Sequence, residues 1–181
     1  MDVMGPNPAN NLPPLQGHGP IAESGGDFCA TAPPRVWHVE QPIQLMTRRL
    51  NAYGVENRDA GLAGMTEPVA IEQIAANEFG RPTRYAMLDR RGVRTDISAE
   101  ALRRVANYAG QGLAAPKQPL SSSNFSSITI AAGKMIFDGS GNGHGVGLCQ
   151  YGAQEMAKAG KTWREILAWY YPGADIVQAY S

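Results

Sequence analysis

The residues best suited to chemistry lie near the C-terminal end of the chain, where residues 139–153 read GSGNGHGVGLCQYGA. Five glycines fall within residues 138–147, and a helical pattern follows them. Glycine lets the backbone approach another group closely because no side chain stands in the way. The first N–H groups of a helix lack intrahelical acceptors and can hold an anion or polar oxygens. With His144, Gln150 and Tyr151 on or beside this loop, the run is typical of a cleft for a polar ligand.

Other chemistries fit the same run less well. A phosphate loop requires G-x-x-x-x-G-K-[ST], whereas here the glycines alternate and no lysine follows. His144 and Cys149 are close enough in sequence for a nucleophile–base pair, but no third residue that would orient the base is identifiable. A cysteine in the first turn of a helix is more often a small buried residue. The histidines, His18, His38 and His144, lack zinc-ligand spacing, and for His144 a structural role in holding the loop stands beside direct ligand contact.

The order of the strands and helices expected from the sequence indicates an α+β fold rather than a βαβ series. Alternation and β-forming residues predict strands at residues 35–40, 68–76, 82–89, 93–97, 125–130 and 134–137. Helical spacing predicts helices at residues 42–53, 99–108, 148–159 and 163–171, and loops at 57–66 and 109–124. Gly54 is the predicted helix stop, Ser98 an N-cap, and Thr162 with Glu165 a capping box. The prediction is a small antiparallel sheet with hairpins and packed helices, and a glycine-rich loop leading into a C-terminal helix pair.

Composition and charge argue against several classes of protein. Sixteen Lys and Arg balance sixteen Asp and Glu, whereas a nucleic-acid-binding surface would need a basic excess. The two cysteines, Cys29 and Cys149, are too few for a disulfide framework or a four-ligand zinc site, and their different contexts disfavour a bridge between them. No apolar run reaches the roughly 18 residues of a membrane span. Residues 1–24 are rich in Pro, Gly and Asn, have no features of a signal peptide, and are predicted to be a flexible lead-in.

From residue 141 onward, the sequence GNGHGVGLCQYGAQEMAKAGKTWREILAWYYPGADI resembles the C-terminal signature of the stage II sporulation protein D family, also called SpoIID/LytB. That signature reads G-H-G-V-G-[ML]-[SC]-Q-[YW]-G-A, then M-A, a glycine and I-L-x-x-Y-Y-P-G. The segments GGDFCATAPPRVWHVEQP, EFGRPTRYAMLDRRGVRTDISAEALRRVAN and LSSSNF resemble other parts of the family. The resemblance therefore covers about residues 25–177.

The resemblance implies action on peptidoglycan. The family includes a lytic transglycosylase that cuts peptide-free glycan strands, and amidase enhancers that are linked to cell-wall hydrolases. It implies substrate-binding residues at the positions that match the motif, with Cys149 at the family's serine position: Gly143, His144, Gly145, Cys149, Gln150 and Tyr151. Tyr170 and Tyr171 are candidates for stacking on sugar rings, although their helical spacing places at least one of them in the core. Neither a metal nor a cofactor is expected.

One departure from the family limits what the chain is expected to do. The family's catalytic glutamate, which serves as acid and then base, lies in a motif Y-[LV]-x-G-V-[VL]-x-x-E-[MV] that these 181 residues do not contain, so no catalytic residue is assigned. Glu72 and Glu78 are the alternative acids, and both are expected to be solvated hairpin carboxylates. Residues 25–181 are thus expected to form a partial SpoIID/LytB-like domain without its N-terminal catalytic segment, whether as a fragment, a split half or a degenerate member.

The expected function is the processing of peptidoglycan glycan strands, as part of a SpoIID-like lytic transglycosylase of the cell envelope. The alternative is a non-catalytic glycan-binding or regulatory module. Glycan strands are the expected partner, together with a second cell-wall hydrolase. Neither nucleic acid nor a membrane span is expected, and no signal peptide is recognisable in the sequence.

Overall fold

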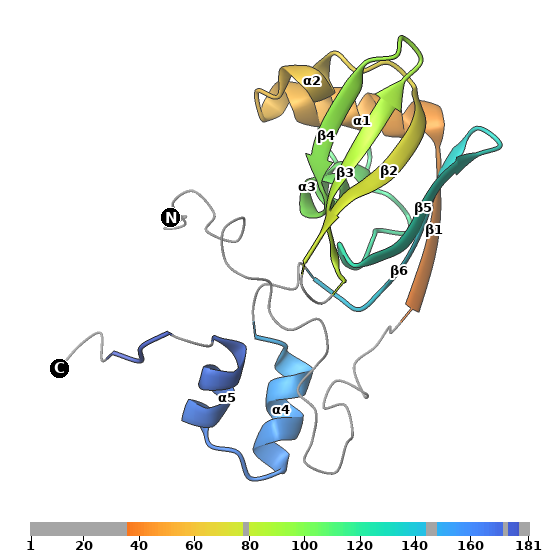
Figure 1. Ribbon diagram of the computed structural model, residues 1–181. Helices are drawn as coiled ribbons and strands as arrows, with labels where there is room; N and C mark the ends of the chain where they lie inside the picture. Colours follow the sequence, from red (N-terminus) through yellow and green to blue (C-terminus); the bar gives the residue numbers. More distant parts are fainter. Residues whose placement is uncertain (1–35, 78–79, 144–147, 172–173, 178–181) are drawn as a thin grey trace. The chain divides into compact units, whose positions relative to one another are not determined.

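The structure is a computed structural model that describes residues 36–77, 80–143, 148–171 and 174–177 (Figure 1). The chain divides into two compact units. One unit is Pro33–His144, and the other combines Met1–Ala32 with Gly145–Ser181.

The unit Pro33–His144 contains two antiparallel sheets of three strands each. The first has the order β1-β6-β5, from β1 (Val36–Pro42), β5 (Phe125–Ala131) and β6 (Lys134–Ser140). The second has the order β2-β3-β4, from β2 (Pro68–Ala76), β3 (Pro82–Asp89) and β4 (Arg94–Ser98). The sheets adjoin where β2 runs beside β5.

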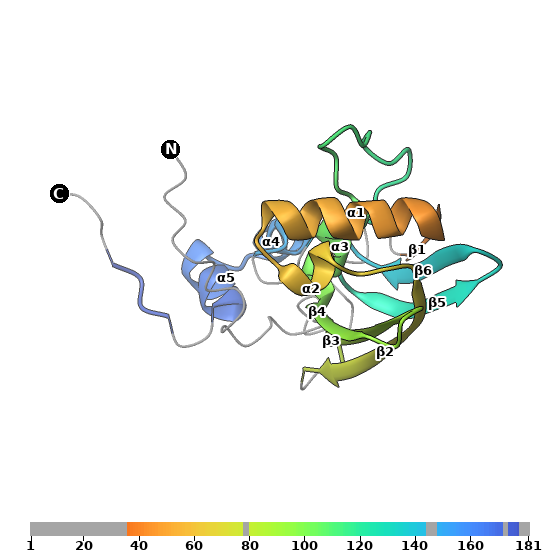
Figure 2. The ribbon, with the colours of Figure 1, turned by 90° about the horizontal axis from the view of Figure 1, so that it is seen from above.

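Three helices of this unit, α1 (Ile43–Glu56), α2 (Ala60–Ala63) and α3 (Ala99–Ala106), connect the two sheets (Figure 2). Helix α1 packs on β1, β6 and α3, and α3 in turn packs on β3 and β4. Ser98 begins α3 as predicted, because its side chain accepts a hydrogen bond from the backbone N–H of Ala101. The α+β class predicted from the sequence is confirmed, with two small sheets in place of one.

The end of α1 differs from the prediction. Gly54 does not stop the helix but lies inside it, and the left-handed residue that ends α1 is Arg58 at φ 57°. The N–H of Asp59 bonds to the carbonyl of Gly54 and the N–H of Arg58 to that of Val55, which is the Schellman pattern. Gly54 serves close packing instead: a Cβ at this position would lie 2.3 Å from the backbone nitrogen of Ala63. That contact comes from α2, a helix within the segment 57–66 that was predicted to be a loop.

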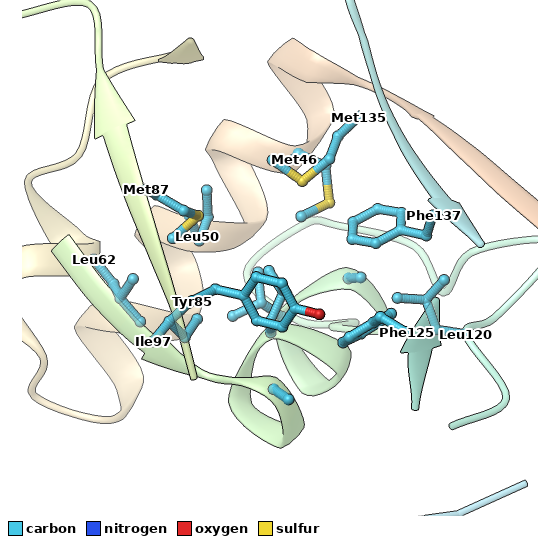
Figure 3. Close-up of a cluster of buried hydrophobic side chains, with 14 of the residues drawn as sticks. Met46, Leu50, Leu62, Tyr85, Met87, Ile97, Leu120, Phe125, Met135 and Phe137 are labelled. Carbon is cyan, nitrogen blue, oxygen red and sulfur yellow. The ribbon is translucent and has the colours of Figure 1, made fainter. Parts of the chain in front are cut away.

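The two sheets and α1 share one hydrophobic core (Figure 3). Its central aromatic residue is Phe125, whose ring lies 5.9 Å from the ring of Trp37 and 5.8 Å from that of Tyr85. The core includes Met46, Leu50, Leu62, Tyr85, Met87, Ile97, Leu120, Phe125, Met135 and Phe137. Burial of each large side chain contributes about 1.5–3 kcal/mol. These strands and helices are therefore held as one body.

A buried arginine ties α1 to the segment that follows α3. Arg49 is 2% exposed, and its Nη1 donates to Gln41 Oε1 at 2.6 Å and to the carbonyl oxygen of Ala106 at 2.9 Å. Its Nη2 donates to the carbonyl oxygen of Ala114 at 3.1 Å. Burial lowers the pKa of Arg49. Because Ala106 ends α3, the guanidinium sits at the negative end of a helix dipole, which offsets part of the cost of burying its charge.

The described part of the other unit is a pair of helices, α4 (Gln150–Lys158) and α5 (Trp163–Tyr170). Met156, Ile166 and Tyr170 are buried between them. The predicted capping box at the start of α5 is confirmed: Thr162 accepts from the N–H of Glu165, and the Glu165 carboxylate accepts from the N–H of Thr162. Within the described residues, no helix combines the length and the apolar character that a membrane crossing requires.

Candidate functional site

Three of the six predicted binding residues lie together at the start of α4. Cys149 is the N-cap, and Gln150 and Tyr151 are the first residues of the helix. His144 and Gly145 lie outside the described residues, so their role stays a prediction. Gly143 lies within the described residues, but it belongs to the unit Pro33–His144, whereas α4 belongs to the other unit.

Cys149 begins α4 through its side chain. Its Sγ accepts a hydrogen bond from the N–H of Gly152 at 3.4 Å, the bond that a serine or threonine makes at an N-cap. The thiol is half-buried against the small core of the helix pair. This arrangement fits a structural role for Cys149.

Polar and aromatic groups surround this helix start. Gln150 is exposed, and the Tyr151 side chain is 43% exposed. The hydroxyl of Tyr171 accepts a hydrogen bond from the N–H of Leu148 at 3.2 Å, so the end of α5 holds the residue just before the N-cap. The first N–H groups of a helix point outward without intrahelical acceptors. The helix start therefore presents donors, an amide side chain and two tyrosine rings.

The two adjacent tyrosines have different environments, as the helical spacing predicted. Tyr170 is 6% exposed and packs with Met156 and Ile166, whereas Tyr171 is 38% exposed. Tyr171 is thus the one of the pair whose side chain is accessible to solvent.

The first glycines of the loop are needed for backbone conformation rather than for close approach. Gly141 and Gly143 have φ 75° and 77°, and a Cβ at either position would meet nothing within 4 Å. The left-handed region disfavours residues with a Cβ, which explains the glycines. Close approach does explain Gly139, where a Cβ would lie 2.2 Å from the ring of Trp37.

A serine-rich segment holds these glycines; it lies in the predicted loop 109–124 and includes the run LSSSNF that resembles part of the family. The N–H of Gly143 donates to the carbonyl oxygen of Ser121 at 2.7 Å. Ser122 Oγ donates to the carbonyl oxygen of Ser140 at 2.7 Å. Ser122 and Ser123 are 1% and 3% exposed. Consecutive serines are ordinary in surface loops, so the sequence carried no signal that these two would be buried.

A polar network on the first sheet was also not predicted. Nδ1 of His38 donates to Asp138 Oδ1 at 2.7 Å, and Ser127 Oγ donates to Asp138 Oδ2 at 2.9 Å. The carboxylate of Asp138 raises the pKa of His38, and hydrogen bonds from His38 and Ser127 lower the pKa of Asp138. His38 and Asp138 border an open hollow of about 430 Å³, within the usual size range of small-molecule sites. The network joins three strands, which sequence spacing alone does not reveal.

Of the two alternative acids, Glu72 lies within the described residues. Glu72 is 66% exposed, and its carboxylate pairs with Arg94 Nη1 at 3.3 Å, which confirms a solvated hairpin carboxylate. Glu78 lies outside the described residues. Among the residues that the structure describes, no three His, Cys, Asp or Glu side chains gather as metal ligands would.

Comparison with known proteins finds short shared segments. No family model matches the chain. It is 56% identical over 39 residues to stage II sporulation protein D of Bacillus subtilis, which is 22% of this chain and 11% of that protein. It is 39% identical over 54 residues to the amidase enhancer of Bacillus subtilis, 30% of this chain and 8% of that protein. It is also 56% identical over 43 residues to an uncharacterized protein of Brachyspira hyodysenteriae, 24% of this chain and 12% of that protein. The matches thus span no more than 12% of these relatives' own lengths.

Proposed function

We propose that this chain takes part in processing peptidoglycan glycan strands in the cell envelope, as a partial SpoIID/LytB-like domain whose role is to hold the glycan. The observation that carries the proposal is the 56% identity, over 39 residues, to a stage II sporulation protein D. The identity to an amidase enhancer supports the same setting, and suggests a second cell-wall hydrolase as a partner.

The chemistry at the start of α4 suits a glycan. Sugar hydroxyl and acetamido groups need donors and acceptors close to an apolar face. The backbone N–H groups of Gln150 and Tyr151, at the start of α4, and the side-chain amide of Gln150 supply the hydrogen-bonding groups. The exposed rings of Tyr151 and Tyr171 supply the apolar face.

Holding is favoured over cutting because no residue of the described structure is placed as a general acid. The general acid that protonates a glycosidic oxygen is a carboxyl group that stays protonated near neutral pH, usually because it is buried. Glu72 is exposed and ion-paired, which is the opposite environment. Lytic transglycosylase activity is the second candidate, and it would require an acid such as the one in the family's glutamate motif.

The test is retention of the purified chain on peptide-free peptidoglycan strands, combined with mass spectrometry of the strands afterwards. We expect retention and intact strands. Tyr151→Ala should weaken retention, whereas Trp163→Ala should leave it unchanged. Trp163 is a matched control because it is 56% exposed and begins α5, at the opposite end of the helix pair.

Each outcome decides between the candidates. Strands with new anhydro ends would mean that an acid within these residues does the chemistry, and Glu78 would be replaced next. A folded chain that is not retained would refute the glycan-holding role.

A further inference from the structure

Residues 121–124, which we term the serine clasp, grip the backbone that leads into the glycine-rich run. Ser122 Oγ donates to the carbonyl oxygen of Ser140 at 2.7 Å, and Asn124 Nδ2 donates to Ser140 Oγ at 3.0 Å. The N–H of Ser140 donates to the carbonyl oxygen of Asn124 at 3.0 Å, and the N–H of Gly143 to that of Ser121 at 2.7 Å. Four hydrogen bonds thus hold a stretch of four residues.

The clasp is unusual for a connecting segment because its two central serines, Ser122 and Ser123, are buried. Loops normally run over the surface, where water satisfies their polar groups. Ser122 is 1% exposed, and its hydroxyl both donates to Ser140 and accepts from the N–H of Asn124 at 3.1 Å. Removing this hydroxyl leaves the half-buried Ser140 carbonyl without this donor and the Asn124 N–H without this acceptor, and an unsatisfied polar group costs more than the net strength of the bond.

A partly buried arginine supports the clasp from the second sheet. Nη2 of Arg81, the residue just before β3, donates to Ser123 Oγ at 3.1 Å. Burial lowers the pKa of Arg81, and the charge of Glu100 opposes that effect. The same residue closes the turn between β2 and β3, since its backbone N–H donates to Asn77 Oδ1 at 2.8 Å. The turn and the clasp are therefore fixed to one another.

Gly141 and Gly143 are the residues that most need such support. Both adopt left-handed backbone with open space where a Cβ would be, so no packing of their own fixes their direction. A glycine-rich segment also has more unfolded conformations to lose than any other. The hydrogen bonds of the clasp supply the restraint that side chains supply elsewhere.

We infer that Ser122 is a positioning residue: through the serine clasp it sets the backbone of residues 140–143, and so the direction in which the glycine-rich run leaves β6. The inference rests on the proposed function only in one respect, namely that a correctly directed run is needed for glycan binding. Ser122 is 1% exposed, so it acts through its hydrogen bond to Ser140.

The first readout does not depend on any ligand. Hydrogen exchange of the Gly143 amide is measured by NMR in the wild type, in Ser122→Ala and in Ser126→Ala. Ser126 is a matched control because it is an exposed serine at the start of β5. We expect exchange at Gly143 to accelerate about ten-fold or more in Ser122→Ala, and by a larger factor than exchange at amides of core strand β3, which report any loss of global stability. Unchanged exchange at Gly143 would overturn the inference.

If Ser122→Ala unfolds the whole unit, Ser140→Ala provides the second test. Ser140 is half-buried, and its replacement removes only the bond from Asn124 Nδ2. Exchange at Gly143 should then accelerate by a smaller factor, about three-fold, with the core intact. A Gly143 amide that exchanges as in the wild type would again contradict the clasp.

The second readout separates this inference from the proposed function. Glycan retention is measured for the same variants at a temperature where each is folded. We expect Ser122→Ala to raise the Kd about ten-fold and Ser126→Ala to leave it unchanged. A wild-type chain that is not retained refutes the glycan-holding role, but it leaves intact the restraint of residues 140–143 that hydrogen exchange measures. Faster exchange in Ser122→Ala with unaltered retention sinks the positioning role alone.

Discussion

Replacement of Gly54 by alanine tests the packing of α1 against α2. In an exposed helix this change would stabilise the protein by about 1 kcal/mol, because alanine is the better helix former. Here the added Cβ would lie 2.3 Å from the nitrogen of Ala63, 2.7 Å from the carbonyl carbon of Leu62 and 2.8 Å from the Cα of Ala63. All three are backbone atoms, so no side chain can rotate away.

The cost follows from what must move. To restore ordinary contact, α2 has to shift by about 1 Å, which disturbs the burial of Leu62. It also disturbs the two bonds from Asn51 Nδ2, at 2.9 Å to the carbonyl of Leu62 and at 2.8 Å to that of Met65. Overpacking of this kind costs about 1–3 kcal/mol, and an immovable backbone favours the upper end. After the helix-propensity gain, we expect a net loss of about 2 kcal/mol.

The assay is urea and thermal unfolding of the full chain followed by circular dichroism. A loss of about 2 kcal/mol should lower Tm by roughly 10 °C for a unit of this size. Gly64→Ala is the control, since Gly64 has φ −95° and its Cβ would meet one atom at 3.3 Å. We expect that variant to stay within about 1 kcal/mol of the wild type. If Gly54→Ala equals or exceeds the wild type in stability, the close approach of α1 and α2 is wrong.

Three further predictions concern side-chain hydrogen bonds. Cys149→Ser should stabilise the helix pair by about 0.5–1 kcal/mol in thermal unfolding, because a hydroxyl is a stronger N-cap acceptor than a thiol. The variant should also retain glycan binding. A loss of retention would instead favour a chemical role for the Cys149 thiol. In an NMR titration, the pKa of His38 should lie above its ordinary 6.5, and it should fall toward 6.5 in Asp138→Asn. The stability that the His38–Asp138 pair contributes is fully present below pH 6.5 and is lost as the pH rises through the raised pKa. A wild-type pKa at or below 6.5 would contradict this account. Arg49→Lys should cost about 2–4 kcal/mol in urea unfolding, because an ammonium cannot reach all three acceptors of the guanidinium; a cost under about 0.5 kcal/mol would refute that account.

Local sequence patterns determined the elements of this fold well. The strands β2 and β3 match their predicted spans, and the other predicted strands and the four predicted helices end within three residues of their structural bounds. Ser98 and Thr162 were recognised as caps because a cap bonds to an N–H only three residues away. Such signals are readable from sequence because every partner lies within one helical turn.

In the candidate site, too, local features could be predicted from the sequence, whereas features that depend on packing could not. Cys149, Gln150 and Tyr151 could be assigned to a helix start, since the change from glycine-rich to helical spacing marks it. That Tyr171 rather than Tyr170 faces solvent needed the packing of α5 on α4, because adjacent helical residues differ only in which direction they point.

By itself, the sequence determined the α+β class, the positions of most elements and the segment shared with sporulation protein D and amidase enhancer. Only the tertiary structure decided the role of Gly54, the burial of Ser122 and the pairing of His38 with Asp138. Each of these depends on a partner between 8 and 100 residues away in the chain. Residue type and local spacing carry no information about such a partner, because it is brought near only when the sheets and helices close around their common core.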